Sequence, residues 1–265
     1  MRRLSLAVML LLAAGRVQAQ ATGDQPTLTL GITGGWVDGA ALWEVPNQPY
    51  LESGGFVTDT FDLSRSLNSG FTFGVTSSYF PSNHFGFTGE IALLGLGTST
   101  NCTAKFSSGS AEATDLCTSL GQANTASTAV AMSVGGVYRI ASREAVSPFI
   151  SAKGGIQISE QSTVDLVGYY FDQANGQQVT VRIFDDPNKT RVEFYAQFGA
   201  GFSFSAGRGY RFRLEARDNY VRLPIPDGPS DPNTGAFTTK VIGKHLFSIV
   251  LGFDILLEKK RGRRY

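Results

Sequence analysis

Charged residues are scarce in this sequence, and so are the residues that usually build metal and redox sites. Only 17% of the 265 residues are Asp, Glu, Lys or Arg, and there are 2 His, 2 Cys and 3 Met. Glycine, by contrast, reaches 31 residues and phenylalanine 19. Such a composition is typical of β structure rather than of a helical bundle. No His-x-x-x-His, Cys-x-x-Cys or glycine-rich phosphate motif occurs, so we expect neither a metal site nor a cofactor.

The N-terminus has the three parts of a secretory signal peptide. Arg2 and Arg3 precede an apolar run from Leu4 to Ala14, and small and polar residues follow. We predict that residues 1–19 are removed, with cleavage after residue 21 as the alternative. The run is much shorter than the ~20 residues of a membrane-spanning helix, so an uncleaved anchor is the weaker interpretation. No cysteine follows the run, which argues against a lipoprotein anchor.

The net charge gives no reason to expect a nucleic-acid partner. Removing the signal peptide takes away Arg2, Arg3 and Arg16, so the 23 basic residues fall to 20, against 22 acidic ones. A nearly neutral chain lacks the basic surface that nucleic acid requires. No other stretch approaches a membrane helix in length. A closed β-barrel, however, crosses a membrane with alternating segments of only ~10 residues.

Eight segments alternate apolar and polar residues with the two-residue period of a β-strand. They span residues 27–37, 69–80, 85–97, 128–140, 148–159, 191–205, 210–221 and 244–257. In the sixth segment, for example, Phe194 and Phe198 oppose Glu193 and Gln197. The third segment is less regular, because two leucines at 94 and 96 fall on its polar face.

The connections between these segments alternate between short and long. Short ones lie near 81–84, 141–147 and 206–209, and long ones cover 38–68, 98–127, 160–190 and 222–243. This alternation is typical of a barrel with short periplasmic turns and long extracellular loops. We therefore predict an all-β fold, an eight-stranded antiparallel up-and-down transmembrane β-barrel over residues 20–258. A basic periplasmic tail, 259–265, follows it.

Two stretches carry a resemblance to a known class. PFISAKGGIQIS (148–159) and VEFYAQFGAGFSFSAGRGYRFRLEARDNY (192–220) resemble the penultimate hairpins of small outer-membrane β-barrel proteins, the OmpA/OmpX-like class. In that class the last strand carries a signal for the outer-membrane assembly machinery, and Gly252, Ile255 and Leu257 fit it. The resemblance implies placement in the bacterial outer membrane, beside lipid and lipopolysaccharide. It implies little about activity, since members range from anchors to adhesins and pores.

The polar faces of the strands carry charged side chains of both signs that would point into the lumen. They are Glu90, Arg139, Lys153, Glu193, Arg211, Arg213, Glu215, Arg217 and Asp254. Eight strands leave an interior just wide enough for side chains, so a closed salt-bridge network is the favoured hypothesis. Glycines on the same faces, such as Gly31 and Gly74, keep a narrow channel for small solutes open as the alternative.

The long loops contain a cysteine pair and several aromatic residues. Cys102 and Cys117 share one loop of an exported protein, so we predict a disulfide between them. The aromatic residues are predicted to contact lipopolysaccharide or another partner, which makes a structural or adhesin-like surface role the leading hypothesis. They are Trp43, Tyr50, Phe56, Tyr169 and Tyr170.

The third long loop is predicted to form a hairpin that prolongs its two flanking strands. Asn175-Gly176 is a strong signal for a two-residue turn, and β-prone residues lie on both sides. Such a turn pairs residues whose numbers sum to 351, so even positions oppose odd ones. Because both flanking strands carry even-numbered apolar faces, one irregularity is required, and Asp185–Asn188 is the candidate.

Three further alternatives have weaker support. A lipid-modifying enzyme would use His245, but Ser248 lies an odd number of residues away and points to the opposite face. A soluble lipocalin-like barrel would share the alternation with inverted polarity, and a Gly-x-Trp sequence ends at Trp36. Asp227 and Asp231 could bind calcium, although their Asp-Pro-Gly surroundings are more typical of turns. We therefore predict no catalytic residues.

Overall fold

The computed structural model describes residues 27–51, 57–105, 111–122, 125–142, 144–160, 162–172, 175–187, 190–206 and 209–257. The predicted signal peptide and basic tail, and Phe56 among the predicted loop contacts, lie outside these ranges. No helix in the described ranges is long and apolar enough to cross a membrane.

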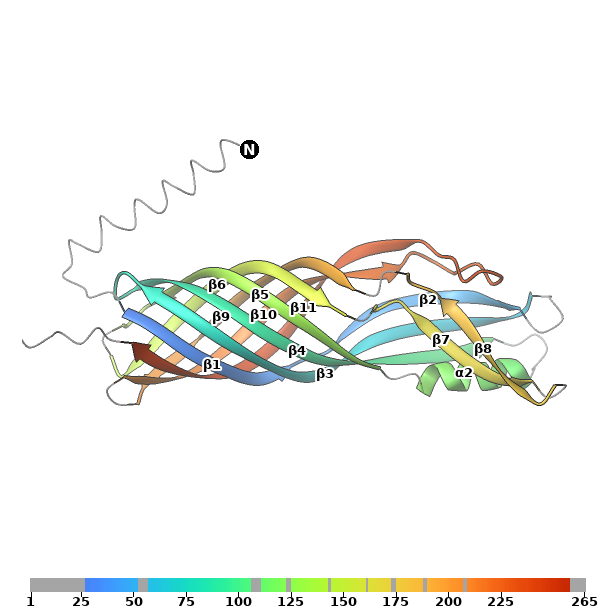
Figure 1. Cartoon of the computed structure of the whole chain (residues 1–265), viewed down its shortest axis with the longest axis horizontal. Helices are drawn as coiled ribbons and strands as arrows, with labels where there is room; N and C mark the ends of the chain where they lie inside the picture. Colours follow the sequence, from blue (N-terminus) through green and yellow to red (C-terminus); the bar gives the residue numbers. More distant parts are fainter. Residues whose placement is uncertain are drawn as a thin grey trace, which may run out of the picture.

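Eight antiparallel strands close into a ring (Figure 1). In ring order they are β1 (Thr27–Val37), β3 (Val57–Phe80), β4 (Phe85–Lys105), β5 (Thr125–Arg139), β6 (Val146–Ser159), β9 (Arg191–Ser205), β10 (Tyr210–Pro226) and β11 (Thr239–Leu257). Strand β1 closes the ring by pairing with β3 on one side and β11 on the other. The predicted eight-stranded antiparallel barrel is confirmed.

The barrel is apolar outside and polar inside. Phe71 is 72% exposed on the outer wall, whereas Glu215, which faces the lumen, is 1% exposed. The outer faces of all eight strands carry large apolar side chains in this way. An outward apolar band is what the hydrocarbon of a bilayer requires. The soluble lipocalin-like alternative needs a polar outer wall and is therefore wrong.

Several strands run far past the membrane. β3 has 24 residues and β4 has 21, against the ~10 that a membrane-crossing strand needs. Strand β2 (Ala40–Leu51) continues the line of β1 along the outer part of β3. The four long connections therefore contain ordered elements over much of their length. They include a helix that the sequence analysis missed, α2 (Ala111–Gln122).

We call the extracellular part of the molecule the cap. It comprises β2, α2, β7 (Leu166–Asp172), β8 (Gln177–Phe184) and the outer parts of β3, β4, β10 and β11. The cap lies at the end of the barrel opposite to the short turns (Figure 1). It has its own apolar core, to which Leu42, Phe61, Leu63, Leu116, Leu120, Leu166, Phe184 and Ile225 contribute.

Three predicted loop contacts belong to this core. Trp43, Tyr50 and Tyr170 are only 6%, 3% and 7% exposed. The indole of Trp43 packs edge-on against Phe184 and donates a hydrogen bond to the Thr163 carbonyl oxygen. Their predicted role as exposed contacts is therefore wrong. Their burial follows from the convergence of loops that are distant in sequence, which alternation within one loop does not reveal.

The hairpin in the third long connection differs from the prediction. β7 and β8 form a separate two-stranded sheet instead of prolonging β6 and β9. Asp172 pairs with Gln177, so the paired numbers sum to 349 and not 351. Gly176, at φ 65°, donates its N–H to the Asp172 carbonyl oxygen and closes a four-residue connection. The register shift falls between Leu166 and Val167, so its predicted place at 185–188 is also wrong.

The predicted disulfide is present. Cys102 on β4 and Cys117 on α2 are bonded, with their Cα atoms 5.4 Å apart. The side-chain oxygen of Ser119 on the same helix accepts a hydrogen bond from the backbone N–H of Tyr169. These two links hold α2 between β4 and β7.

The double substitution Cys102→Ser/Cys117→Ser should loosen the cap and leave the barrel closed. Opening a loop of this length returns about 3 kcal/mol of chain entropy to the unfolded state. Hydrogen exchange should therefore become faster in α2 and β7, while heat-dependent gel mobility, which reports the closed barrel, stays unchanged. Alkylation of the wild type without reductant should produce no mass shift, and a shift would contradict the disulfide.

Candidate functional site in the barrel lumen

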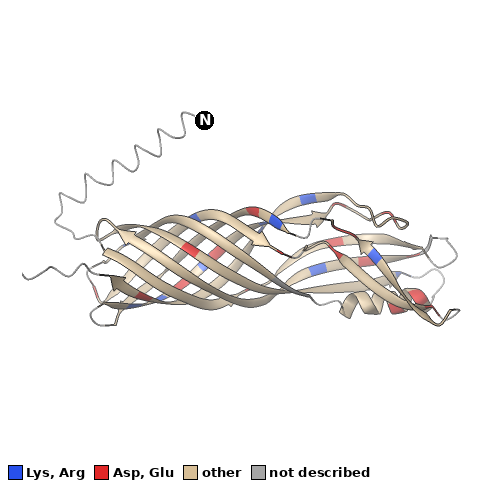
Figure 2. Ribbon diagram, viewed as in Figure 1, with Lys and Arg blue, Asp and Glu red and all other residues tan. Residues whose placement is uncertain are grey.

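The lumen is filled by side chains that alternate positions on the barrel strands direct inward. Figure 2 shows Lys, Arg, Asp and Glu within the barrel wall as well as in the cap. From the periplasmic mouth towards the cap, the lumen contains an arginine-rich mouth, an ion-pair layer, an amide layer and an apolar ceiling. Each layer takes residues from several strands, because the register of the closed sheet sets them at similar heights.

The ion-pair layer joins four of the nine predicted lumen charges. Lys153 on β6 donates to Glu90 on β4, and Arg217 on β10 donates to the other Glu90 oxygen at 2.8 Å. The second Nη of Arg217 lies 2.8 Å from Glu215 Oε2. The remaining Glu215 oxygen accepts a hydrogen bond from the Ser151 hydroxyl at 2.8 Å. All four charged side chains are buried, so each depends on its partners for the solvation that water would supply.

The amide layer lies directly above and was not predicted. Tyr195 donates its hydroxyl to Asn219 Oδ1 at 2.7 Å, and Gln197 Nε2 lies 3.1 Å from the same oxygen. Asn219 Nδ2 donates to the Ser248 hydroxyl and to the Leu246 carbonyl oxygen. These neutral residues occupy the same inward positions as the charges below them. Strand parity could have identified them, but a search for charge alone could not.

An apolar ceiling separates the polar lumen from the cap. It consists of Val37, Leu94, Leu96, Ala129, Ala131, Val221 and Leu246, all buried and continuous with the cap core. The two leucines of β4 are the residues that made the third segment irregular. They face the lumen as parity requires, but at a height where the lumen is apolar. The extracellular end of the barrel is therefore closed by packed hydrocarbon.

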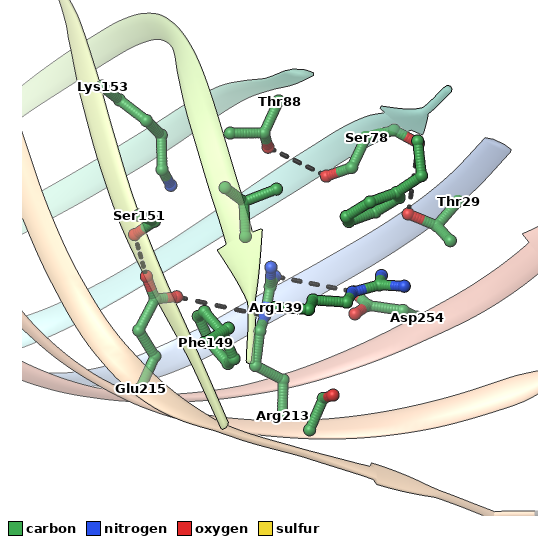
Figure 3. A pocket seen from close by; sticks show the side chains of 13 residues that line it. Thr29, Ser78, Thr88, Arg139, Phe149, Ser151, Lys153, Arg213, Glu215 and Asp254 are labelled. Atoms are coloured by element: carbon green, nitrogen blue, oxygen red, sulfur yellow. Dashed lines mark hydrogen bonds and ion pairs between the residues drawn. The ribbon is translucent and has the colours of Figure 1, made fainter. Parts of the chain in front are cut away.

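The periplasmic mouth holds a second charged group around a small cavity of about 20 Å³, which is room for about one water molecule (Figure 3). Arg213 lies 3.5 Å from Asp254 and donates to the Thr76 hydroxyl. The guanidinium carbon of Arg139 is 3.4 Å from the centre of the Phe80 ring, in cation–π contact. Arg211 makes no ion pair within the described ranges.

The last predicted lumen residue stands apart from these layers. Glu193 lies on β9 above the amide layer, opposite Gln157 of β6. It is half-buried and joins no ion pair in the described part of the chain. The structure thus joins six of the nine predicted charges in ion pairs, sets Arg139 and Arg211 beside them at the mouth, and leaves Glu193 at the outer rim.

The residues considered for catalysis and calcium binding have other contacts. His245 is exposed on the outer wall of β11, with Nδ1 2.8 Å from Asp218, while Ser248 is buried on the lumen side as predicted. Asp231 accepts hydrogen bonds from the backbone N–H groups of Asn233 and Thr234, which lower the pKa of its carboxyl group. Within the described ranges no three potential metal ligands come together.

Comparisons with known proteins add little to this picture. No family model matches the chain, and no curated protein matches it. Among solved structures, Neisserial surface protein A aligns at 11% identity and a TM-score of 0.42, over 88% of this chain and 99% of the other. The outer membrane protein OprG from Pseudomonas aeruginosa has the same identity and TM-score, over 88% and 97%. The Escherichia coli outer membrane protease OmpT aligns at 10% identity and 0.40, over 87% and 97%.

These similarities are too low to carry an argument about function. The fold assignment rests on the closed ring and its outward apolar band. On both points the chain has the architecture of the small outer-membrane barrels that its sequence resembles.

The substitution Glu215→Ala should strongly destabilise the barrel. It removes one partner of Arg217 and leaves a buried guanidinium only partly paired. Such a change lowers the free energy of unfolding by about 3–5 kcal/mol. Urea unfolding in lipid vesicles, followed by tryptophan fluorescence, measures the difference. Lys240→Ala, which breaks an exposed pair with Asp227, is the matched control and should have little effect. Equal stability of the two variants would contradict a supporting role for the ion-pair layer.

Proposed function

We propose that this protein is a non-conducting outer-membrane barrel that presents a folded cap at the cell surface. The observation that carries the proposal is the occlusion of the lumen. A buried ion-pair layer, an amide layer and an apolar ceiling follow one another along the barrel axis, from the periplasmic side towards the cap. Because the ceiling is part of the cap core, opening the lumen would require the cap to unfold locally. The barrel therefore serves as an anchor, and the cap is the part available to partners.

The channel alternative has one supporting feature, the cavity at the periplasmic mouth. This cavity reaches Lys153 and Glu215 and stops at the ion-pair layer. Moving an ion past that layer would separate charges that have no water to replace their partners.

Purified wild-type protein in planar bilayers should therefore show no steady single-channel current. The physical reason is the buried apolar ceiling, whose side chains cannot replace the hydration of an ion. The variant Leu94→Ser/Leu96→Ser wets the ceiling and provides a comparison in which conductance can appear. A stable, ion-selective current from the wild type would overturn the non-conducting assignment and favour the narrow channel.

We also propose placement in the bacterial outer membrane, which the closed ring and its outward apolar band support together with two features of the sequence. The signal peptide predicted at residues 1–19 would export it. Gly252, Ile255 and Leu257 on the last strand would engage the outer-membrane assembly machinery. Ile255 and Leu257 both lie on the outer wall of β11, where a partner can reach them before the ring closes.

We propose the outward face of β7 as the contact surface of the cap. Val167, Tyr169 and Phe171 alternate along it and are 39%, 47% and 52% exposed. Gln178 and Thr180 on β8 are paired with Phe171 and Tyr169 and add amide and hydroxyl groups. Aromatic rings beside neutral hydrogen-bonding groups suit a partner with both apolar and hydroxyl surfaces. In the outer leaflet, the saccharide part of lipopolysaccharide offers both.

The double substitution Tyr169→Ser/Phe171→Ser should weaken binding of purified lipopolysaccharide at least tenfold, because it removes two aromatic anchors from the surface. Calorimetry on the detergent-folded protein provides the measurement. Val241→Ser, which removes an exposed apolar residue from another cap hairpin, is the control and should bind normally. Equal binding by the wild type and both variants would exclude β7 as the contact.

The wild type and both variants should resist carbonate extraction from outer membranes, because their apolar outer walls face lipid. Recovery as soluble periplasmic protein would contradict the proposed location.

A further inference from the structure

A groove lies in the cap where the helix α2 runs beside β7 (Figure 1). Its volume is about 490 Å³, which falls within the ~300–1,000 Å³ of small-molecule binding sites. Three elements supply the side chains that line it: Asp115, Thr118 and Gln122 on α2, Tyr169 and Phe171 on β7, and Gln178 on β8.

Two contacts hold α2 against the edge of β7 that β8 leaves free. The Ser119 hydroxyl oxygen accepts a hydrogen bond from the backbone N–H of Tyr169 at 2.8 Å. A Cβ atom at Gly168 would come within 2.7 Å of Leu116 and 2.8 Å of Leu120, so the helix can lie this close only against glycine. Together with the disulfide, these contacts form the groove before any ligand arrives. A preformed site does not spend binding energy on ordering its own walls.

The two walls of the groove differ in chemistry. Asp115, Thr118 and Gln122 are spaced three and four residues apart, so they share one exposed face of α2. The other wall presents the rings of Tyr169 and Phe171, which are 47% and 52% exposed. Within the described ranges, neither the Asp115 carboxylate nor the Gln122 amide forms a hydrogen bond. The helical wall therefore has free hydrogen-bonding groups opposite an aromatic wall.

The groove carries negative charge only. Asp115 is the one charged side chain among the described residues that line it, and neither Lys nor Arg is present there. A ligand with phosphate or carboxylate groups would meet a like charge with no cation beside it. Hydroxyl groups, by contrast, are good partners for a carboxylate, which has two acceptor oxygens. The lining thus favours an uncharged ligand rich in hydroxyl groups.

We propose that the groove binds an uncharged hexose ring of the lipopolysaccharide saccharide, an inference that rests on the β7 contact surface proposed above. One face of a hexose ring consists of C–H groups, and this face packs on an aromatic ring such as Tyr169. The hydroxyl groups at its edge donate to Asp115, while the Gln122 amide both donates and accepts. Gln178, which is paired with Phe171, supplies a second amide. Asp115 disfavours the acidic sugars and phosphates next to the lipid and so selects the neutral outer sugars.

Calorimetry on the detergent-folded wild type tests this selection with two preparations of lipopolysaccharide. One has its full saccharide, and the other is truncated after the acidic sugars next to the lipid. The full-length form should bind at least about tenfold more tightly, because only it offers neutral hexoses to the groove. Lipid-free polysaccharide released from the full-length form should compete with it.

Variants of the helical wall separate the groove from the aromatic rings of β7. Asp115→Ala/Gln122→Ala should weaken binding of the full-length form about tenfold and leave the truncated form unchanged. Asp115→Asn keeps an acceptor but removes the charge, so it should bind the acidic truncated form more tightly than the wild type does. A merely structural role for Asp115 would not produce that gain. Asp227→Ala removes an exposed cap carboxylate outside the groove and is the matched control, which should bind both forms normally.

The outcomes distinguish the groove from the β7 surface. If the wild type binds both forms equally and Tyr169→Ser/Phe171→Ser loses both, the β7 contact stands and the hexose site is refuted. The site is also refuted if Asp115→Ala/Gln122→Ala binds the full-length form as tightly as the wild type. If the wild type binds neither form, the β7 contact and the hexose site both fail.

Discussion

Closure of the sheet at β1 is the constraint on which the rest of the structure depends. This strand pairs along its whole length with β3 and along nearly all of it with β11, so no barrel strand is left with an open edge inside the membrane. In hydrocarbon an unpaired backbone group has no water to bind, and only a closed ring avoids the loss. Eight strands in turn fix a narrow interior. The contents of the lumen follow from that width.

Burial works in opposite senses in the two parts of the molecule. In the barrel, polar side chains are buried and apolar ones face outward, so ion pairs and hydrogen bonds hold the interior. In the cap, which meets water, apolar side chains are buried around Phe61 and Leu116 as in a soluble domain. The ceiling at Leu94 and Leu96 is where one arrangement changes into the other. This junction places buried apolar side chains across the extracellular end of the barrel, continuous with the cap core.

The lumen also differs between its two ends. Next to the ceiling, neutral amides and hydroxyls satisfy one another, and in the middle Glu90 and Glu215 are matched by Lys153 and Arg217. At the periplasmic mouth Arg139 and Arg211 lack such partners in the described part of the chain. Towards the extracellular end, the buried charges of the lumen are thus paired with one another.

Alternation along the sequence alone determined the eight barrel strands, their inward and outward faces, and the lumen position of the predicted charges except Glu193 at the outer rim, because parity is a local property of a strand. Cysteine spacing and export determined the disulfide in the same way. Only the tertiary structure decided the burial of Trp43, Tyr50 and Tyr170, the helix α2 and the separate β7–β8 sheet, because each depends on loops distant in sequence that pack together. The register of the closed ring likewise decided which charges pair and which two arginines do not.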